Sequence, residues 1–325
     1  MAARSVRWRG FGVTVEVPER VAALLRRRSL SGVDLPPQML QLGDPPALRV
    51  AKHSPEQAIK FFYNPDHDPV ATGLDPADFR IPLDAAKTLT DDPAEADDIA
   101  SVVWYHTMEL PSGVVTPGEY DHRPLVPHYG LPDDLTGQRA LDVGTNNGFW
   151  AFELERRGAT VTAVDVAMIS ELDYPAGVGE MIRATGVDIP VGRGFAVAHK
   201  LLKSNVEKVV SNIYALHPAT HGTFDFVHIA DLLLHLREPL RALERVRSVT
   251  GGRALIVDVF DPYEPPGHTA YLGGWDGVRW WRPSLQTLTQ MVLDAGFSRV
   301  RLERVFNLAH GGGAGPWRAV LHADP

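Results

Sequence analysis

Two side chains that can move a proton follow the apolar run 224–230. Asp231 and His235 are four residues apart, so one helical turn would present both on the same face. An imidazole accepts a proton close to neutral pH, and a nearby carboxylate can orient it or a substrate. We therefore predict His235 as a general base and Asp231 as its helper. The alternative is that both residues only cap helices.

A turn containing glycines is the second feature with chemical meaning. Residues 139–150, RALDVGTNNGFW, run from an apolar stretch through Gly144, Asn146 and Gly148 into a helical pattern. Backbone N–H groups at such a helix N-terminus can approach a ligand closely. Asn146 stands where dinucleotide-binding turns carry a middle glycine, and asparagine tolerates the positive φ needed there.

Two acids end the strands that flank this turn. Asp142 precedes the turn and suits a cationic or hydroxylated ligand rather than a diphosphate. Asp165, followed by Val166, ends the next apolar stretch, where a carboxylate can accept two ribose hydroxyls. Strand, turn, helix, strand and acid in this order predict a nucleotide-binding unit.

The elements that position these residues alternate along the rest of the chain. Apolar runs predict strands near 139–143, 160–165, 207–212, 224–230, 253–259, 299–306 and 316–322. Helical spacing predicts helices near 148–158, 167–185 with breaks, 237–249 and 284–296. The pattern favours an α/β fold with a doubly wound, seven-stranded, mostly parallel sheet and an antiparallel pair at its edge.

The first part of the chain differs in composition. We predict an N-terminal α+β segment, 1–125, that shapes the substrate site or mediates dimerisation, and a cofactor-binding domain, 126–325. Within the segment, β-formers occupy 5–16 and a helix is expected after Pro18. A strand over 47–51, a helix over 54–63, a loop over 64–69, a helix that the acidic run 91–98 opens or precedes and a hairpin at 111–113 are also expected.

Composition limits the function classes. The chain has 325 residues, a formal net charge of −8 and no cysteine, which excludes disulfides, cysteine-based zinc sites and thiol catalysis. The acidic balance argues against broad binding to nucleic acid or anionic membranes. Neither an apolar run long enough for a membrane span nor a secretory signal is visible, so we expect a cytoplasmic protein.

These motifs resemble the class I S-adenosylmethionine-dependent methyltransferases. LDVGTNNGFW (141–150) matches the first motif of that family and AVDV (163–166) the second. The resemblance implies that S-adenosylmethionine is the cofactor, with its amino-acid end at Gly144 and its ribose at Asp165. SNIYAL (211–216) holds the place of the adenine-lining segment, so Ile213 and Tyr214 are the expected adenine contacts.

A narrower likeness involves WYHTMEL (104–110), LLLHLREPL (232–240) and WWRP (280–283). They look like the wider group around the tRNA wobble-uridine carboxymethyltransferase. The first hundred residues lack that enzyme's basic, Trp-rich approach region, and the sequence reveals no cation for a carboxymethyl donor. Ordinary S-adenosylmethionine is therefore the expected donor.

The acceptor side is less defined by the sequence. Tyr105 and His106 are expected to fold over the site, and Trp281 is a candidate for a flat pocket, with aromatic core as the alternative. His228 lies within a strand and is expected to be a core or backbone-bonded histidine. The acids Asp258, Asp261 and Glu264 suit magnesium, but we predict that they border the pocket or face solvent, and we expect no metal.

The sequence thus predicts O-methylation of a small molecule, such as a natural product or sugar, in specialised metabolism. A tRNA-modifying enzyme and a non-catalytic cofactor-binding domain are the alternatives. A homodimer formed through the N-terminal segment is the expected assembly.

Overall fold

The computed structural model of the chain describes residues 3–7, 14–18, 79–186, 188–274, 278–307 and 316–325. The chain divides into two compact units, Met1–Pro37 and Gln38–Pro325. In the first unit, β1 (Ala3–Arg7) pairs antiparallel with β2 (Thr14–Pro18), as the β-formers there predict. The elements expected at 47–51, 54–63 and 64–69, and the helix expected after Pro18, lie outside the described residues.

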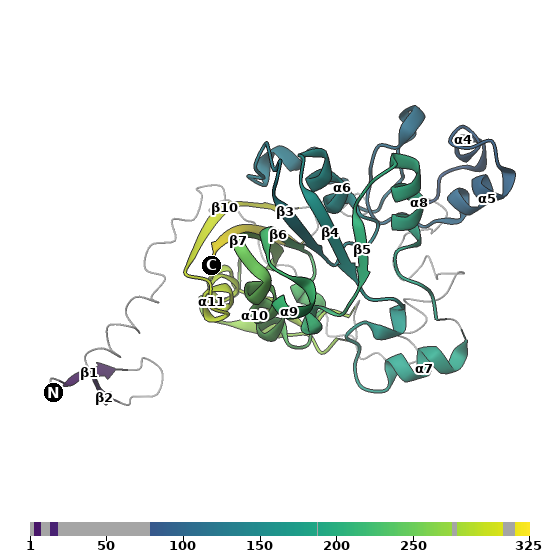
Figure 1. The fold of residues 1–325 in the computed structure, drawn as a ribbon. Coiled ribbons are helices and arrows are strands. Elements are labelled where there is room, and N and C mark those ends of the chain that lie inside the picture. Colours follow the sequence, from purple (N-terminus) through teal and green to yellow (C-terminus); the bar gives the residue numbers. More distant parts are fainter. Residues whose placement is uncertain (1–2, 8–13, 19–78, 187, 275–277, 308–315) are drawn as a thin grey trace. The chain divides into compact units, whose positions relative to one another are not determined.

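The second unit is built on a seven-stranded sheet, as far as the structure describes it. Its strands lie in the order β10-β11-β7-β6-β3-β4-β5 (Figure 1). Their bounds are β3 Arg139–Val143, β4 Thr160–Asp165, β5 Glu207–Val210, β6 Phe224–Ala230, β7 Thr250–Phe260, β10 Arg299–Asn307 and β11 Trp317–Asp324. β11 is antiparallel to both β7 and β10, and the other neighbouring pairs are parallel. The predicted fold class is confirmed.

The strand order places a ligand-binding edge between β3 and β6. From β3 the chain continues outward through β4 and β5 on one side, and it returns to β6 and β7 on the other. In such sheets ligands bind beyond the carboxyl ends of the strands where the winding reverses. Val143 and Ala230, the last residues of β3 and β6, mark this edge.

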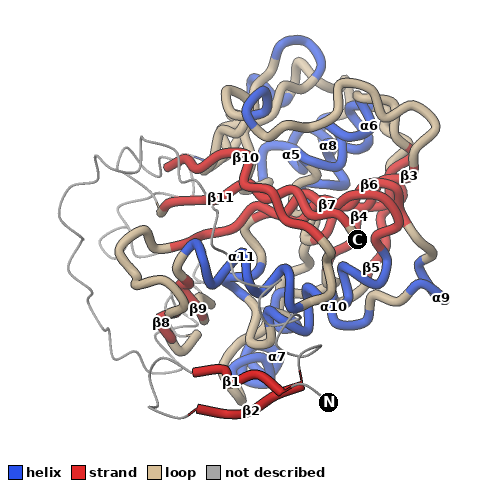
Figure 2. Tube along the Cα trace, turned by 90° about the vertical axis from the view of Figure 1, so that its left-hand side faces the viewer, coloured by secondary structure: helices blue, strands red, loops and turns tan. Residues whose placement is uncertain are grey.

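Helices cover both faces of the sheet (Figure 2). α6 (Phe149–Arg156) and α8 (Arg193–Leu202) bury residues such as Trp150 and Phe195 against one face. α10 (Pro239–Val249) and α11 (Leu285–Asp294) bury their apolar stripes against the other. The sheet is therefore the middle of three layers, and its carboxyl edge stays accessible to connecting segments.

Shorter elements complete the fold. They are α4 (Leu83–Ala86), α5 (Pro93–Ser101), α7 (Val178–Thr185), α9 (Pro218–His221), β8 (Thr269–Tyr271), β9 (Trp281–Pro283) and the 3₁₀ turns η3 (Pro111–Gly113), η4 (Val126–His128), η5 (Ile169–Glu171), η6 (Ile213–Ala215) and η7 (Leu233–His235). Asp92 caps α5, accepting a hydrogen bond from the backbone N–H of Ala94 at 2.9 Å. The acidic run thus opens a helix, as predicted.

Two local predictions differ from the structure, and a third is not tested by it. Helix α8 lies where the sequence analysis expected none, although Phe195, Ala198 and Leu202 have helical spacing. The hairpin expected at 111–113 is a 3₁₀ turn flanked by the isolated bridge Glu109–Val115. The predicted boundary at 125/126 stays a prediction, because both of its sides fall within the unit Gln38–Pro325.

Candidate active site

The glycine turn has the backbone geometry that a close-lying ligand needs. Gly144, Asn146 and Gly148 adopt φ values of 76°, 47° and 91°. A Cβ on Gly144 would lie 2.9 Å from the side chain of Leu232, and one on Gly148 would lie 2.5 Å from Phe152. Both positions therefore require glycine, for its positive φ and for its lack of a side chain.

Asp165 ties the end of β4 to this turn. Its carboxylate accepts hydrogen bonds from the backbone N–H groups of Asn146 at 2.8 Å and Val166 at 2.9 Å. Burial raises the pKa of Asp165 above its usual value, and the two backbone donors oppose that shift. Each carboxylate oxygen keeps a further lone pair, so the group can still accept ribose hydroxyls.

Asp142 lies beside a histidine rather than open to solvent. Oδ1 of Asp142 is 2.7 Å from Nδ1 of His228, and both side chains are buried. The two residues are direct neighbours in the register of β3 and β6. Oδ2 of Asp142 and Nε2 of His228 have no partner among the described residues. The prediction that His228 is a core or backbone-bonded histidine is thus half right: the residue is buried, but it bonds a carboxylate.

Ile213 and Tyr214 form η6, directly after β5. Ile213 is buried, and the Tyr214 hydroxyl donates to the carboxylate of Asp173 and accepts from the backbone N–H of Glu238 at 3.1 Å. Asp173 also accepts the backbone N–H of Arg237 at 2.7 Å. Sequence analysis missed Asp173, which holds the expected adenine segment against the start of α10.

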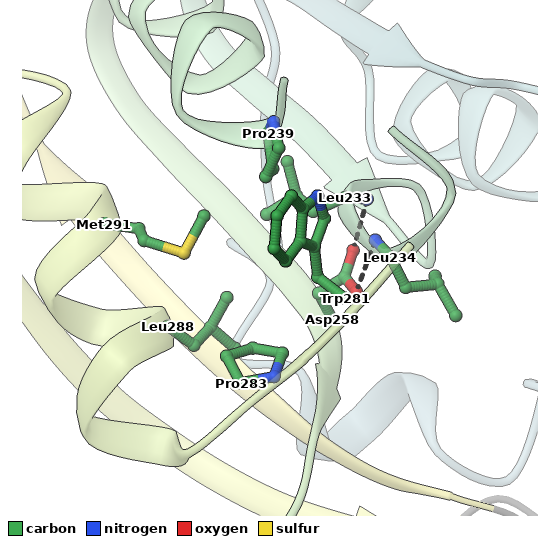
Figure 3. A pocket seen from close by; sticks show the side chains of 8 residues that line it. All are labelled: Leu233, Leu234, Pro239, Asp258, Trp281, Pro283, Leu288 and Met291. Atoms are coloured by element: carbon green, nitrogen blue, oxygen red, sulfur yellow. Dashed lines mark hydrogen bonds between the residues drawn. The ribbon is translucent and has the colours of Figure 1, made fainter. Parts of the chain in front are cut away.

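The segment after β6 is fixed by Asp258 from the neighbouring strand β7. The carboxylate of Asp258 accepts the backbone N–H groups of Leu232 at 3.0 Å and Leu233 at 2.7 Å, and it lies at the end of a pocket (Figure 3). Burial, and next the charge of Asp231, raises its pKa to about 7. Asp258 is buried and lines this pocket, so of the two expected positions, beside a pocket or facing solvent, the second is wrong. Asp258, rather than Asp231, caps the 3₁₀ turn η7.

Asp231 and His235 have separate partners. The backbone of Asp231 adopts φ 48°, and its carboxylate receives Nε–H of Arg318 at 2.7 and 2.8 Å. Nδ1 of His235 lies 3.2 Å from the carbonyl oxygen of Val278. The helical turn expected to align the two residues is replaced by η7, which starts at Leu233.

Arg318, the partner of Asp231, is a second residue of this region that sequence analysis missed. It is 3% exposed on β11, and its guanidinium lies 5.6 Å from the centre of the Tyr120 ring. The charge of Asp231 helps raise the pKa of Arg318, so the guanidinium stays protonated. An arginine on the last strand, 87 residues from its acid, leaves no local signal in the sequence.

Residues 105–122 cover the glycine turn from the N-terminal side. Oδ1 of Asn147 accepts the backbone N–H of Tyr105 at 2.6 Å and of His106 at 3.2 Å. The rings of Tyr105 and Tyr120 lie 5.0 Å apart. Burial raises the pKa of Tyr105 and lowers the pKa of His106 and of His122 to about 3, so these three side chains are uncharged at neutral pH.

Trp281, on β9, contacts the segment before α10 and lines a pocket. Its indole N–H donates to the carbonyl of Arg237 at 3.2 Å, and its ring lines a small pocket (Figure 3). The pocket is apolar except for Asp258; its lining is Leu233, Leu234, Pro239, Asp258, Trp281, Pro283, Leu288 and Met291. Trp280 is buried and donates to the carbonyl of Asp173 at 2.6 Å.

The described residues offer neither a metal-binding cluster nor a membrane-spanning helix. They contain no cluster of three or more His, Cys, Asp or Glu residues able to hold a metal ion. Among them, no helix has both the length and the apolar character that crossing a bilayer requires.

The residues at the carboxyl edge of β3 and β4 fit S-adenosylmethionine. The bare backbone of the turn, the carboxylate of Asp165 and the unpartnered, buried Oδ2 of Asp142 offer acceptors and close approach. These groups match a ligand with a ribose diol and a cationic amino group.

Comparison with known proteins identifies the family of the chain. The family described as "Methyltransferase domain" matches residues 121–302. Over 196 residues the chain is 24% identical to a tRNA U34 carboxymethyltransferase of Trichlorobacter lovleyi, covering 58% of this chain and 52% of that protein. Over 37 residues it is 57% identical to a magnesium-protoporphyrin O-methyltransferase of Rhodobacter capsulatus, covering 11% of this chain and 16% of that one. The chain thus spans about half or less of each relative's length.

Two solved structures were also compared. The N-terminal domain of EvdMO1 with S-adenosylhomocysteine bound has a TM-score of 0.48 at 16% identity, covering 74% of this chain and 94% of that chain. Magnesium protoporphyrin IX methyltransferase of Synechocystis has a TM-score of 0.38 at 17% identity, covering 58% and 75%. The family match includes the glycine turn, Asp165 and η7. The chain therefore belongs to the methyltransferase domain family.

Proposed function

We propose that this enzyme methylates a hydroxyl group of a small molecule, with His235 as the general base. The observation that carries the proposal is the contact between Nδ1 of His235 and the carbonyl oxygen of Val278. Because a carbonyl can only accept, Nδ1 carries the proton and Nε2 is the basic nitrogen of the neutral ring. A hydroxyl acceptor needs such a base, since it must lose its proton as its oxygen becomes bonded to the methyl carbon.

The cofactor residues are proposed from the geometry of the turn. Gly144, Asn146 and Gly148 offer backbone to the amino-acid end, and Asp142 offers a carboxylate. Asp165 and Val166 would hold the ribose, and Ile213 and Tyr214 would line the adenine. When bound, S-adenosylmethionine supplies a methyl group on a positively charged sulfur. The task left to the protein is alignment and proton removal.

The acceptor side is proposed to be formed by the segment over the turn. Tyr105 and His106 are tied to Asn147 by their backbones, which supports a role in shaping the site. Asp231 is held by Arg318 and is proposed to orient the acceptor rather than His235. We also propose that Trp281 binds the acceptor and that segment 1–125 shapes the acceptor site. We further propose that the enzyme is a homodimer and that it is located in the cytoplasm.

The charge distribution favours a small acceptor and ordinary S-adenosylmethionine. The net charge is −8, which disfavours a polyanion. A carboxymethyl donor would need a cation to hold its carboxylate. Arg318, the buried cation described near Asp231, already has its charge paired. Modification of tRNA is the second candidate function, because the 24% identical relative carries that name.

The proposal is tested with methyl-labelled S-adenosylmethionine, a panel of small hydroxylated compounds and tRNA. We expect label in a small hydroxylated acceptor, and His235→Gln should lower kcat about 10²- to 10⁴-fold while the Kd for S-adenosylhomocysteine is unchanged. The control is His268→Gln, which changes a histidine that is exposed in the described structure and should leave kcat unaltered.

Two other outcomes would overturn the proposal. Label in tRNA, with an affinity that falls steeply as salt is raised, would establish the second candidate. Tight binding of S-adenosylhomocysteine without transfer to any acceptor would establish a non-catalytic cofactor-binding domain.

A further inference from the structure

Asp142 and His228 form a buried pair, and the proposed function gives a role to Asp142 alone. Oδ1 of Asp142 lies 2.7 Å from Nδ1 of His228, and the side chains are 3% and 1% exposed. The ring of Trp150 lies 4.8 Å from the imidazole, at an angle of 38°. Strand register on one side and the indole on the other therefore hold the imidazole in place against the carboxylate.

The unpartnered atoms define the protonation of this pair. Nε2 of His228 is buried and has no hydrogen-bond partner among the described residues. A proton on Nε2 would bury an unsatisfied N–H of a cation, which costs far more than an unused lone pair. The neutral ring with its proton on Nδ1 is therefore favoured, and that proton is donated to Oδ1 of Asp142.

Asp142 consequently keeps both a negative charge and an unused oxygen. The neutral imidazole does not cancel the charge, and Oδ2 has no partner in the part of the chain that the structure describes. Thr145, in the adjacent turn, also has a buried hydroxyl oxygen without a partner. A buried carboxylate requires a hydrogen-bond donor or a cation beside it. The place next to Asp142 and Thr145 therefore suits a group that is both a hydrogen-bond donor and a cation.

We infer that His228 is a positioning residue that locks the carboxylate of Asp142 so that Oδ2 faces the α-ammonium group of S-adenosylmethionine. The inference rests on the cofactor placement proposed above. An ammonium supplies three N–H donors and a positive charge, which satisfies Oδ2 and the uncompensated carboxylate together. His228 acts through Asp142 and does not itself touch the reacting atoms.

The experiment compares two ligands that differ in the amino-acid part. S-adenosylhomocysteine carries the α-ammonium, whereas 5′-methylthioadenosine keeps the adenosine and the sulfur but lacks that group. Calorimetric Kd values are measured for the wild type, His228→Leu and His228→Asn. We expect His228→Leu to weaken S-adenosylhomocysteine binding about tenfold or more and to leave 5′-methylthioadenosine binding unchanged. His228→Asn retains an N–H where Nδ1 lies, so it should recover most of the difference.

A matched control separates positioning from general damage. His322 is also a buried histidine, on β11, and its Nε2 lies 3.0 Å from the carbonyl of Tyr129. His322→Leu removes a similar volume and should alter the two affinities equally or not at all. Circular dichroism confirms that each variant is folded.

Asp142→Asn gives an independent reading, even where His228→Leu fails to fold. It should reduce the affinity for S-adenosylhomocysteine relative to that for 5′-methylthioadenosine, as His228→Leu does. The double variant should show no further loss of affinity, because the two residues act as one unit. The inference would be overturned if His228→Leu lost the same binding free energy for both ligands. It would also be overturned if the losses of binding free energy in the double variant were strictly additive. Since the readout is cofactor binding alone, an error in the proposed acceptor or base leaves this result intact.

Discussion

The Nε atom of Arg318 lies 2.7 Å from Oδ1 and 2.8 Å from Oδ2 of Asp231. The side chains are 4% and 12% exposed, so little water reaches the pair. It joins the start of β11 to the end of β6, across the intervening strand β7. Two segments distant in the sequence are thereby fixed beside the glycine turn.

Breaking this pair should destabilise the protein. Arg318→Met leaves Asp231 as a buried carboxylate without its cation, and we expect a loss of about 3–5 kcal/mol in the free energy of unfolding. Asp231→Asn in the same chain removes the uncompensated charge and should restore part of the loss. Urea unfolding followed by circular dichroism measures both. A loss below 1 kcal/mol in Arg318→Met would contradict the view that the pair is dry.

Gly144→Ala should weaken cofactor binding. The new methyl group would meet Leu232 at 2.9 Å, and the residue would be held at φ 76°. Gly137 has a similar φ of 77° but open space around the added carbon, so Gly137→Ala carries the backbone strain without the clash. We expect a lower affinity for S-adenosylhomocysteine in Gly144→Ala only. Equal affinities in the two variants would show that the close approach of Leu232 is unimportant.

Asp165→Asn should also weaken cofactor binding. The carboxylate accepts the N–H groups of Asn146 and Val166, and the amide would turn one acceptor into a donor. Loss of a charge-assisted contact corresponds to about 1.5–3 kcal/mol, or a 10- to 100-fold higher Kd by calorimetry. Asp134→Asn is the control, because Asp134 makes a comparable bond to the N–H of Thr136 at an exposed turn. A Kd unchanged in Asp165→Asn would remove this acid from the site.

The buried histidines predict that stability falls with acid. Burial lowers the pKa of His106 and of His122 to about 3 from the ordinary 6.5. Between these values the unfolded chain takes up protons that the folded chain does not, so the free energy of unfolding decreases as pH falls from about 6.5 towards 3.

Replacing one of these histidines should reduce that dependence. We expect His122→Gln to lower the slope of the free energy of unfolding against pH by up to about 1.4 kcal/mol per pH unit, which is the value for one proton. His128→Gln is the control, since His128 is exposed on the same segment. Urea titrations between pH 4 and 6 give the slopes. If His122→Gln leaves the slope unaltered, the imidazole titrates freely in the folded protein.

The fold and the cofactor turn could be predicted because their signals are local. The run from Asp142 to Gly148 and the acid at Asp165 each follow directly from a strand, and the structure places them at one edge. Helix α8 was missed because Gly192 and Gly194 interrupt its start, although Phe195 and Ala198 face the core.

The contacts of the segment after β6 could not be predicted because they join distant parts of the chain. The cap of η7 is Asp258, which comes from the next strand rather than from the preceding residues. The partner of Asp231 is Arg318, near the end of the chain. Because Asp231 and His235 are four residues apart, the sequence suggested that they form a pair. In the structure, contacts with distant residues determine the partner of each.

The amide side chain of Asn147 links the glycine turn to residues 105 and 106. Oδ1 of Asn147 receives the main chain of Tyr105 and of His106 while belonging to the glycine turn. A displacement of the glycine turn is therefore expected to move Tyr105 and His106 with it. A substitution that reshapes the glycine turn is therefore expected to reshape the segment over it as well.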